Sequence, residues 1–173
     1  MELWQIILLA VVQGATEFLP ISSSGHLVIV EHLVNLQGNL LALNVLLHAG
    51  TLGSILVFYR KSILELFRDR RVIGLLAVGT VPAIACGLAI EGIEKFTGHS
   101  PLESPLVAGL MLPVTGAMLL WIVGRDGKLE YPKLSYRQAL LIGGFQAFAI
   151  LPGISRSGST IVAGLLEIGR AHV

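Results

Sequence analysis

The sequence has little charge and almost no cysteine. Charged residues make up 13% of the 173 residues and apolar residues 54%, whereas a soluble domain carries about 25% charged residues. Cys86 is the single cysteine, which excludes a disulfide framework and a thiolate metal site. A net charge of +1 without a basic stripe gives no support to nucleic-acid binding. The N-terminus has neither a basic stretch nor a small-residue cleavage motif, so we expect its apolar residues to belong to the mature fold rather than to a signal peptide.

Long stretches contain no charged residue at all. Residues 40–59, 72–90 and 105–124 are such stretches, and each has the roughly 20 residues that a helix needs to cross a hydrocarbon core of about 30 Å. We therefore predict an all-α polytopic membrane protein with spans at 40–59, 72–90 and 105–123. Residues 1–166 are expected to form one membrane domain.

The Lys and Arg residues indicate the orientation of the spans. They concentrate in 60–71 and 125–137, whereas 91–104 has Lys95 against three glutamates. Short loops rich in Lys and Arg stay on the cytoplasmic side. We expect 60–71 and 125–137 to be cytoplasmic loops and 91–104 to face outside.

The two remaining apolar segments, 1–36 and 138–166, are each interrupted by a similar polar motif. The first break reads LPISSSGH from Leu19 and the second LPGISRSG from Leu151. With one glycine inserted, the two align as an internal repeat. Proline, glycine and serine interrupt helices, and non-helical backbone at membrane depth is tolerated only when buried in protein or lining a wet cavity. The charge pattern has the hairpins entering from opposite faces, so we predict an inverted-topology repeat of two broken, re-entrant hairpins that meet near the midplane and form a binding site.

Three ionisable residues lie at or beside the breaks: Glu17, His26 and Arg156. An unpaired charge at that depth is costly, so such residues are candidates for a functional site. A structural ion pair between Glu17 and Arg156 is the alternative interpretation.

Serine and glycine surround these charges. The residues that we expect to bind the oxygens of a substrate are Gln13, Ser22, Ser24, Gly25, Ser155, Ser157 and Gly158. Loops of this kind that open into helix N-termini bind phosphate, and the arginine fork fits a phosphate. Helix capping alone is the alternative, but it requires one serine per helix rather than three.

Catalytic roles follow from the same residues. His26 is a candidate proton carrier or nucleophile, and Ser23 is the alternative nucleophile. Gln13 and Glu17 share a helical face and are the candidate ligands of a divalent metal. His48 lies in a charge-free span, where a packed histidine is the simpler interpretation and a lining residue of the site is the other.

At these motifs the sequence resembles the undecaprenyl-diphosphate phosphatases of the bacitracin-resistance type. The match comprises Gln13, the run Glu17 to His26 and the run Pro152 to Gly158. The resemblance implies hydrolysis of undecaprenyl diphosphate to undecaprenyl phosphate and inorganic phosphate, which recycles the lipid carrier of peptidoglycan synthesis. It also implies a bacterial cytoplasmic (inner) membrane location, a site that opens toward the outer face, and dependence on a divalent cation, Mg or Ca.

Carried over residue by residue, the resemblance gives Glu17, Ser23, His26 and Arg156 catalytic roles. Gln13 occupies a place where the family has Glu or Gln, which weakens a scheme with two carboxylate metal ligands. The attacking group can be serine, histidine or water. The oligomeric state is left open, a homo-oligomer included.

Family members continue beyond the second motif. Residues 167–173 resemble translated sequencing-adapter DNA, so we expect a non-native tail on a C-terminally truncated chain, which an intact natural stop codon at the locus would disprove.

Two other functions compete with this one. The second lipid-phosphatase superfamily shares a Ser-Gly-His element but requires a Lys-containing motif and a later histidine, whose place is taken by Val162, and we reject it. A polyprenyl-phosphate flippase or transporter that uses the same site remains the alternative, because inverted repeats with broken helices are a transporter architecture.

Overall fold

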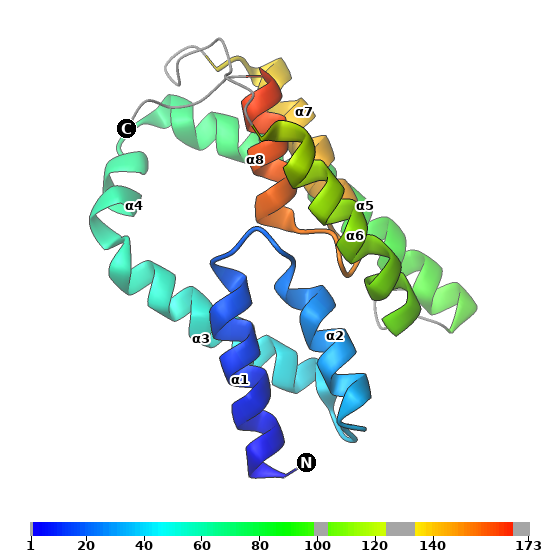
Figure 1. Ribbon diagram of the computed structural model, residues 1–173. Coiled ribbons are helices and arrows are strands. Elements are labelled where there is room, and N and C mark those ends of the chain that lie inside the picture. Colours follow the sequence, from blue (N-terminus) through cyan, green and yellow to red (C-terminus); the bar gives the residue numbers. More distant parts are fainter. Residues whose placement is uncertain (1, 99–103, 124–133, 168–173) are drawn as a thin grey trace.

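The computed structural model is all-helical and describes residues 2–98, 104–123 and 134–167 (Figure 1). Within these ranges the helices are α1 (Leu3–Glu17), α2 (Ser23–Leu33), α3 (Leu40–Phe58), α4 (Arg60–Leu66), α5 (Arg70–Thr97), α6 (Pro105–Ile122), α7 (Tyr136–Phe148) and α8 (Arg156–Glu167).

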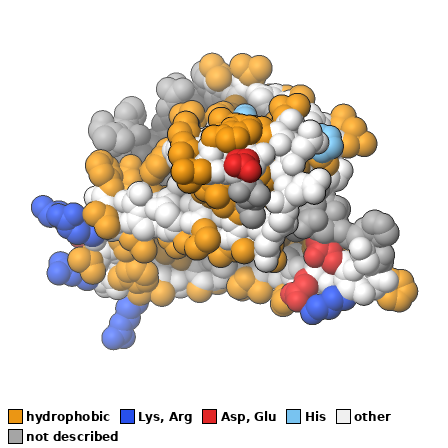
Figure 2. Space-filling model, turned by 90° about the horizontal axis from the view of Figure 1, so that it is seen from below, with side chains coloured by type: hydrophobic (Ala, Val, Ile, Leu, Met, Phe, Trp, Pro, Cys, Tyr) orange, Lys and Arg blue, Asp and Glu red, His pale blue; other side chains and the backbone are white. Residues whose placement is uncertain are grey.

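Three of these helices are long and apolar enough to cross a membrane. They are α3, α5 and α6, and they correspond to the predicted spans. Little of each helix is buried inside the structure: 6% of the apolar window of α3, none of that of α5 and 17% of that of α6. Figure 2 accordingly shows apolar side chains spread over the surface, with Lys and Arg at one margin and again beside acidic side chains near the opposite margin. Such surfaces suit contact with lipid.

Two segments that were predicted to be loops, 60–71 and 91–104, are partly helical. Residues 60–71 contain the helix α4, which follows α3 with only Tyr59 between them. No proline or glycine occurs from 54 to 73, so residues 60–66 can adopt a helical conformation. α5 extends to Thr97, past the predicted end at residue 90, because Glu91 and Lys95 pair one helical turn apart at 2.7 Å.

The ends of the helices follow from capping residues. The Asn39 side chain accepts from the backbone N–H of Ala42 at 3.0 Å and Asp69 from that of Arg71 at 2.8 Å. Ser135 forms a capping box with Gln138 that begins α7. Each cap satisfies an N–H group that the first helical turn leaves unpaired. The expected tail lies outside the described residues except Glu167, which ends α8.

The helices form two groups that face each other across the breaks. α1 and α2 make one hairpin, beside α3; α7 and α8 make the other, against α5. α6 packs against both hairpins, through α2 and α8. In Figure 1 the blue α1–α2 tip points toward the orange turn that leads into α8. The helices are interrupted where the sequence predicted.

α5 and α7 pack with their backbones in contact. A Cβ atom added to Gly143 would lie 2.2 Å from the carbonyl oxygen of Gly79, whereas one added to the neighbouring Gly144 would meet nothing within 4 Å. Glycine at 143 is therefore required by the packing and glycine at 144 is not.

This difference gives a matched pair of variants. Gly143→Ala is expected to lower the midpoint of thermal unfolding in detergent, because overpacking against backbone costs about 1–3 kcal/mol. Gly144→Ala should leave the midpoint unchanged or raise it, since alanine favours a helix by about 1 kcal/mol over glycine. Equal midpoints for the two variants would show that the α5–α7 contact is looser than described.

Candidate functional site

The first break is a tight turn that ends at Ser22. Ser22 has a φ of +69°, which is uncommon for a residue other than glycine. Its backbone carbonyl oxygen lies 2.7 Å from Nδ1 of His26 and 3.3 Å from the His26 backbone nitrogen. The Ser22 side chain accepts weakly from the Gly25 N–H at 3.4 Å. These bonds turn the chain so that α2 begins at Ser23.

The second break has a similar design. Gly153 has a φ of +93°, a conformation that favours glycine. Ser155 Oγ accepts from the backbone N–H of Gly158 at 3.0 Å and lies 3.1 Å from Ser157 Oγ. Each sequence motif therefore contains a serine that caps the next helix, Ser22 or Ser155, as the capping alternative expected. The additional serines need another explanation.

A threonine from α6 holds the second break from outside. Thr115, 4% exposed, donates through Oγ1 to the Gly153 carbonyl oxygen at 2.7 Å and accepts from the Ser155 N–H at 3.0 Å. One hydroxyl thus satisfies two buried backbone groups that the break removes from helical bonding. The sequence analysis missed Thr115, and only a polar residue in an apolar span could have signalled it.

Replacement of Thr115 tests this interpretation. Thr115→Val keeps the shape but leaves a buried carbonyl and a buried N–H unpaired, at about 1–3 kcal/mol each. We expect a lower midpoint of thermal unfolding for Thr115→Val and a near-normal one for Thr115→Ser, which keeps the hydroxyl. If valine and serine behave alike, the two bonds do not hold the break.

The two breaks touch each other. A Cβ atom on Gly25 would lie 2.6 Å from the Cα of Gly153, and one on Gly158 would lie 3.0 Å from the Pro20 carbonyl oxygen. Gly25 and Gly158 therefore allow close approach of backbones, and neither lines the pocket described next.

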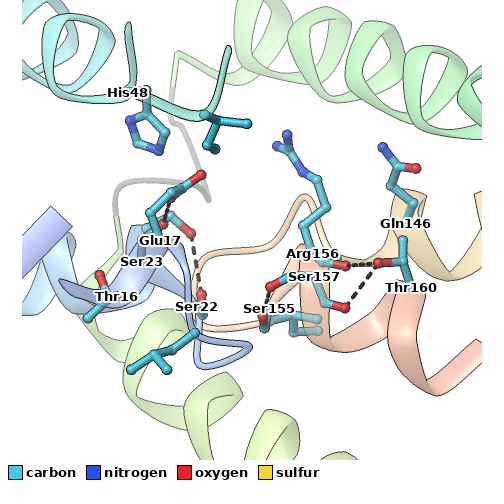
Figure 3. Close-up of a pocket in the computed structure, with 15 residues that line it drawn as sticks. Thr16, Glu17, Ser22, Ser23, His48, Gln146, Ser155, Arg156, Ser157 and Thr160 are labelled. Atoms are coloured by element: carbon cyan, nitrogen blue, oxygen red, sulfur yellow. Dashed lines mark hydrogen bonds between the residues drawn. The ribbon is translucent and has the colours of Figure 1, made fainter. Parts of the chain in front are cut away.

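A pocket of about 410 Å³ lies at this junction. Its polar lining comes from α1 and the first break on one side, from the second break and α8 on the other, and from α3 and α7 (Figure 3). The polar lining residues are Thr16, Glu17, Ser22, Ser23, Ser24, His48, Gln146, Ser155, Arg156, Ser157 and Thr160.

On the first wall a serine, a carboxylate and an amide form a chain of hydrogen bonds. Ser23 Oγ donates to Oε2 of Glu17, and Gln13 Nε2 donates to the same oxygen at 3.0 Å. Gln13 is buried behind Glu17, with its Nε2 also 3.5 Å from Thr51 Oγ1. A hydroxyl paired with a base that a third group orients is the arrangement of an activated nucleophile.

On the opposite wall lies Arg156, whose guanidinium makes no hydrogen bond or ion pair with any described residue. Figure 3 shows this side chain extended, with Ser155 and Ser157 at its base. Glu17 and Arg156 line the same pocket but do not form an ion pair with each other, so the structural ion-pair alternative is wrong. The arginine fork is free to bind a ligand.

The two histidines named in the sequence analysis differ in their place relative to the pocket. His26 does not line the pocket, and its Nδ1 is held at the Ser22 carbonyl. His48 does line it, with Nδ1 2.8 Å from the Asn44 carbonyl oxygen. The structure therefore brings Glu17, Ser23 and Arg156 together and leaves His26 behind the first turn.

Three polar lining residues were missed as site residues: Thr16, Gln146 and Thr160. Thr16 and Thr160 flank the motifs, and Gln146 precedes the second break as Gln13 precedes the first. Their positions next to the two repeated motifs could have identified them as site residues.

The donor set also bears on a divalent cation. Oε1 of Gln13 is buried without a hydrogen-bond partner, which is unusual for a buried polar atom and fits a missing ligand such as a cation. Among the residues that the structure describes, however, no three His, Cys, Asp or Glu side chains form a metal-binding group. The chain thus supplies few oxygens, and most ligands would have to come from a substrate and water.

These features define a class: a helical membrane protein whose polar pocket joins two interrupted helices and presents serine hydroxyls, a carboxylate and an arginine. The chain belongs to the family described as bacitracin resistance protein BacA, whose model matches residues 6–170. This membership, together with the three apolar helices, makes it an integral membrane protein.

The chain is also similar to relatives named undecaprenyl-diphosphatase. The chain is 54% identical over 168 residues to an undecaprenyl-diphosphatase of Rhodopirellula baltica, covering 95% of the chain and 63% of the relative. It is 40% identical over 188 residues to one of Desulfatibacillum aliphaticivorans, covering 93% and 66%. It is 41% identical over 164 residues to undecaprenyl-diphosphatase 3 of Bacillus cereus, covering 91% and 61%. The chain thus spans a little under two thirds of the length of these relatives.

Proposed function

We propose that this protein hydrolyses undecaprenyl diphosphate to undecaprenyl phosphate and inorganic phosphate, and so recycles the lipid carrier of peptidoglycan synthesis and contributes to bacitracin resistance. The names of the relatives and the family support this activity. The observation that carries the proposal is one pocket with a serine–carboxylate pair on one wall and an unpaired arginine on the other.

The terminal phosphoryl group is proposed to bind between these walls. Arg156 binds two phosphate oxygens through its planar fork, and the hydroxyls of Ser22, Ser24, Ser155 and Ser157 provide further donors. Negative charge develops on these oxygens as the anhydride bond breaks. The arginine and the hydroxyls stabilise this charge because they are already positioned around it.

Ser23 is the proposed nucleophile and Glu17 its base. Oγ of Ser23 forms a bond to the terminal phosphorus, its proton passes to Oε2 of Glu17, and the bond from phosphorus to the bridging oxygen breaks. Undecaprenyl phosphate leaves with that oxygen. Water then attacks the phosphoserine, and inorganic phosphate departs as Ser23 regains a proton. Attack by water activated directly by Glu17 uses the same base.

His26 is proposed to act from behind the first turn. Its bond to the Ser22 carbonyl supports the conformation that presents Ser23, so it is a positioning residue in this scheme.

A divalent cation, Mg or Ca, is proposed to assist. Glu17 would hold it together with phosphate oxygens, and Gln13 Oε1 is the second candidate ligand. When bound, the cation neutralises negative charge on the diphosphate.

The membrane arrangement is proposed to follow the charge pattern. The two hairpins are re-entrant halves of an inverted repeat in a bacterial cytoplasmic membrane, and the pocket opens toward the outer face. Each break contains one residue in the left-handed conformation, Ser22 or Gly153, and the hairpin tips oppose each other in Figure 1; both features support this arrangement.

The decisive experiment is phosphate release from undecaprenyl diphosphate by the chain expressed to its natural stop codon and purified in detergent. Release above that of a Glu17→Gln control supports the enzyme. Transbilayer movement of the lipid in vesicles without phosphate release would instead support the flippase alternative.

A further inference from the structure

A second cavity adjoins the polar pocket. It has a volume of about 270 Å³ and lies between α5 and α7. Its lining is mostly aliphatic, with Val72, Leu75, Leu76, Ala139 and Ile142 among the contributors.

The two cavities share part of their walls. Gln146 of α7 and Thr160 of α8 line both, and Figure 3 shows these two side chains beyond Arg156, on the side away from Glu17. Gln146 and Thr160 therefore form the boundary between a pocket lined by serine and arginine and a cavity lined by aliphatic side chains.

This juxtaposition fits an amphipathic ligand better than two separate ones. A prenyl diphosphate has an isoprenoid chain attached directly to its phosphates, so any site for the phosphates needs an apolar surface within a few atoms. Burial of methylene groups there is favourable. We propose that the cavity between α5 and α7 binds the first isoprenoid units of the lipid substrate, next to the phosphates.

Close backbone packing fixes the floor of this cavity. The Gly143 and Gly79 backbones touch, and a Cβ on Gly79 would meet the Ala139 carbonyl oxygen at 3.2 Å. Gly79 and Gly143 line the cavity without side chains, so they do not fill it. Their backbone contact forms a closely packed, rigid wall of the cavity.

The direction also agrees with the proposed orientation. The cavity runs from Gln146 and Thr160 toward Val72 and Leu134, at the ends of α5 and α7 that the charge pattern places on the cytoplasmic side. A lipid of the outer leaflet points its chain in this direction.

The inference rests on the proposed function, and photolabelling tests it separately. The probe is a prenyl diphosphate analogue with a methylene-bridged diphosphonate, which resists hydrolysis, and a diazirine in its first isoprenoid units. Labelling within 72–80 and 134–146, suppressed by excess undecaprenyl diphosphate, is the expected result. Competed labelling elsewhere in a protein that still releases phosphate overturns the inference alone. No competed labelling together with no phosphate release overturns the proposed function as well.

Neighbouring residues on α7 provide a second measurement. Ile142→Trp fills the cavity, whereas Leu141 is exposed and does not line it. Ile142→Trp is expected to raise KM for undecaprenyl diphosphate about tenfold, the equivalent of two excluded methylene groups. It should change KM little for inorganic diphosphate, which carries no isoprenoid unit, and Leu141→Trp should change neither. An equal rise for both substrates, or the same rise for Leu141→Trp, would contradict the assignment.

Discussion

Glu17→Gln is expected to reduce kcat for undecaprenyl diphosphate by about a thousandfold. The amide has the shape of the carboxylate but cannot take the proton of Ser23, whose Oγ donates to Glu17 Oε2. General bases contribute about 10²- to 10⁴-fold, and loss of an interaction needed mainly in the transition state lowers kcat rather than binding. The measurement is steady-state phosphate release in detergent micelles.

Glu65→Gln on α4 is the matched control, since Glu65 lies outside the pocket and should retain full kcat. Ser23→Ala separates the two attack routes. A loss as large as that of Glu17→Gln indicates attack by serine, whereas a loss of only a few fold indicates water. Full activity of Glu17→Gln would disprove the base assignment.

The sequence predicted the helices and their breaks well because their causes are local. Charge-free runs of about 20 residues fix the spans, and Pro20, Pro152 and the serine-glycine runs interrupt helices wherever they occur. The helix α4 was missed because Arg60 and Lys61 were interpreted as a loop signal, although these residues also favour helices.

The site was predicted less completely because its assembly depends on tertiary contacts. Glu17, Ser23 and Arg156 were identified from their depth and chemistry, and the structure places them in one pocket. The place of His26 behind the first turn depends on the left-handed conformation of Ser22. The residues around a serine do not predict such a conformation. Thr115 comes from a span distant in sequence, so only the packing of α6 reveals it. For His48 the sequence left a packed and a lining role open, and the packing of α3 decides between them.

Arg156→Ala is expected to lower kcat/KM for undecaprenyl diphosphate by about a hundred- to a thousandfold. The guanidinium has no partner among the described residues, so its removal breaks no internal bond and the fold should survive. The loss comes from the phosphate oxygens, since removal of one preorganised donor to developing charge costs about 10²- to 10³-fold. Arg156→Lys should recover only part of the activity, because an ammonium group restores the charge but not the bidentate fork.

Arg137→Ala is the matched control on the same hairpin, because Arg137 lies on α7 outside the pocket. Its kcat/KM and its unfolding midpoint should equal those of the parent chain. Guanidinium ions added to Arg156→Ala should restore part of the activity by occupying the vacated space, and they should have no such effect on Glu17→Gln. If Arg156→Ala instead retains kcat/KM while its unfolding midpoint falls, the arginine is structural and the phosphate must bind elsewhere in the pocket.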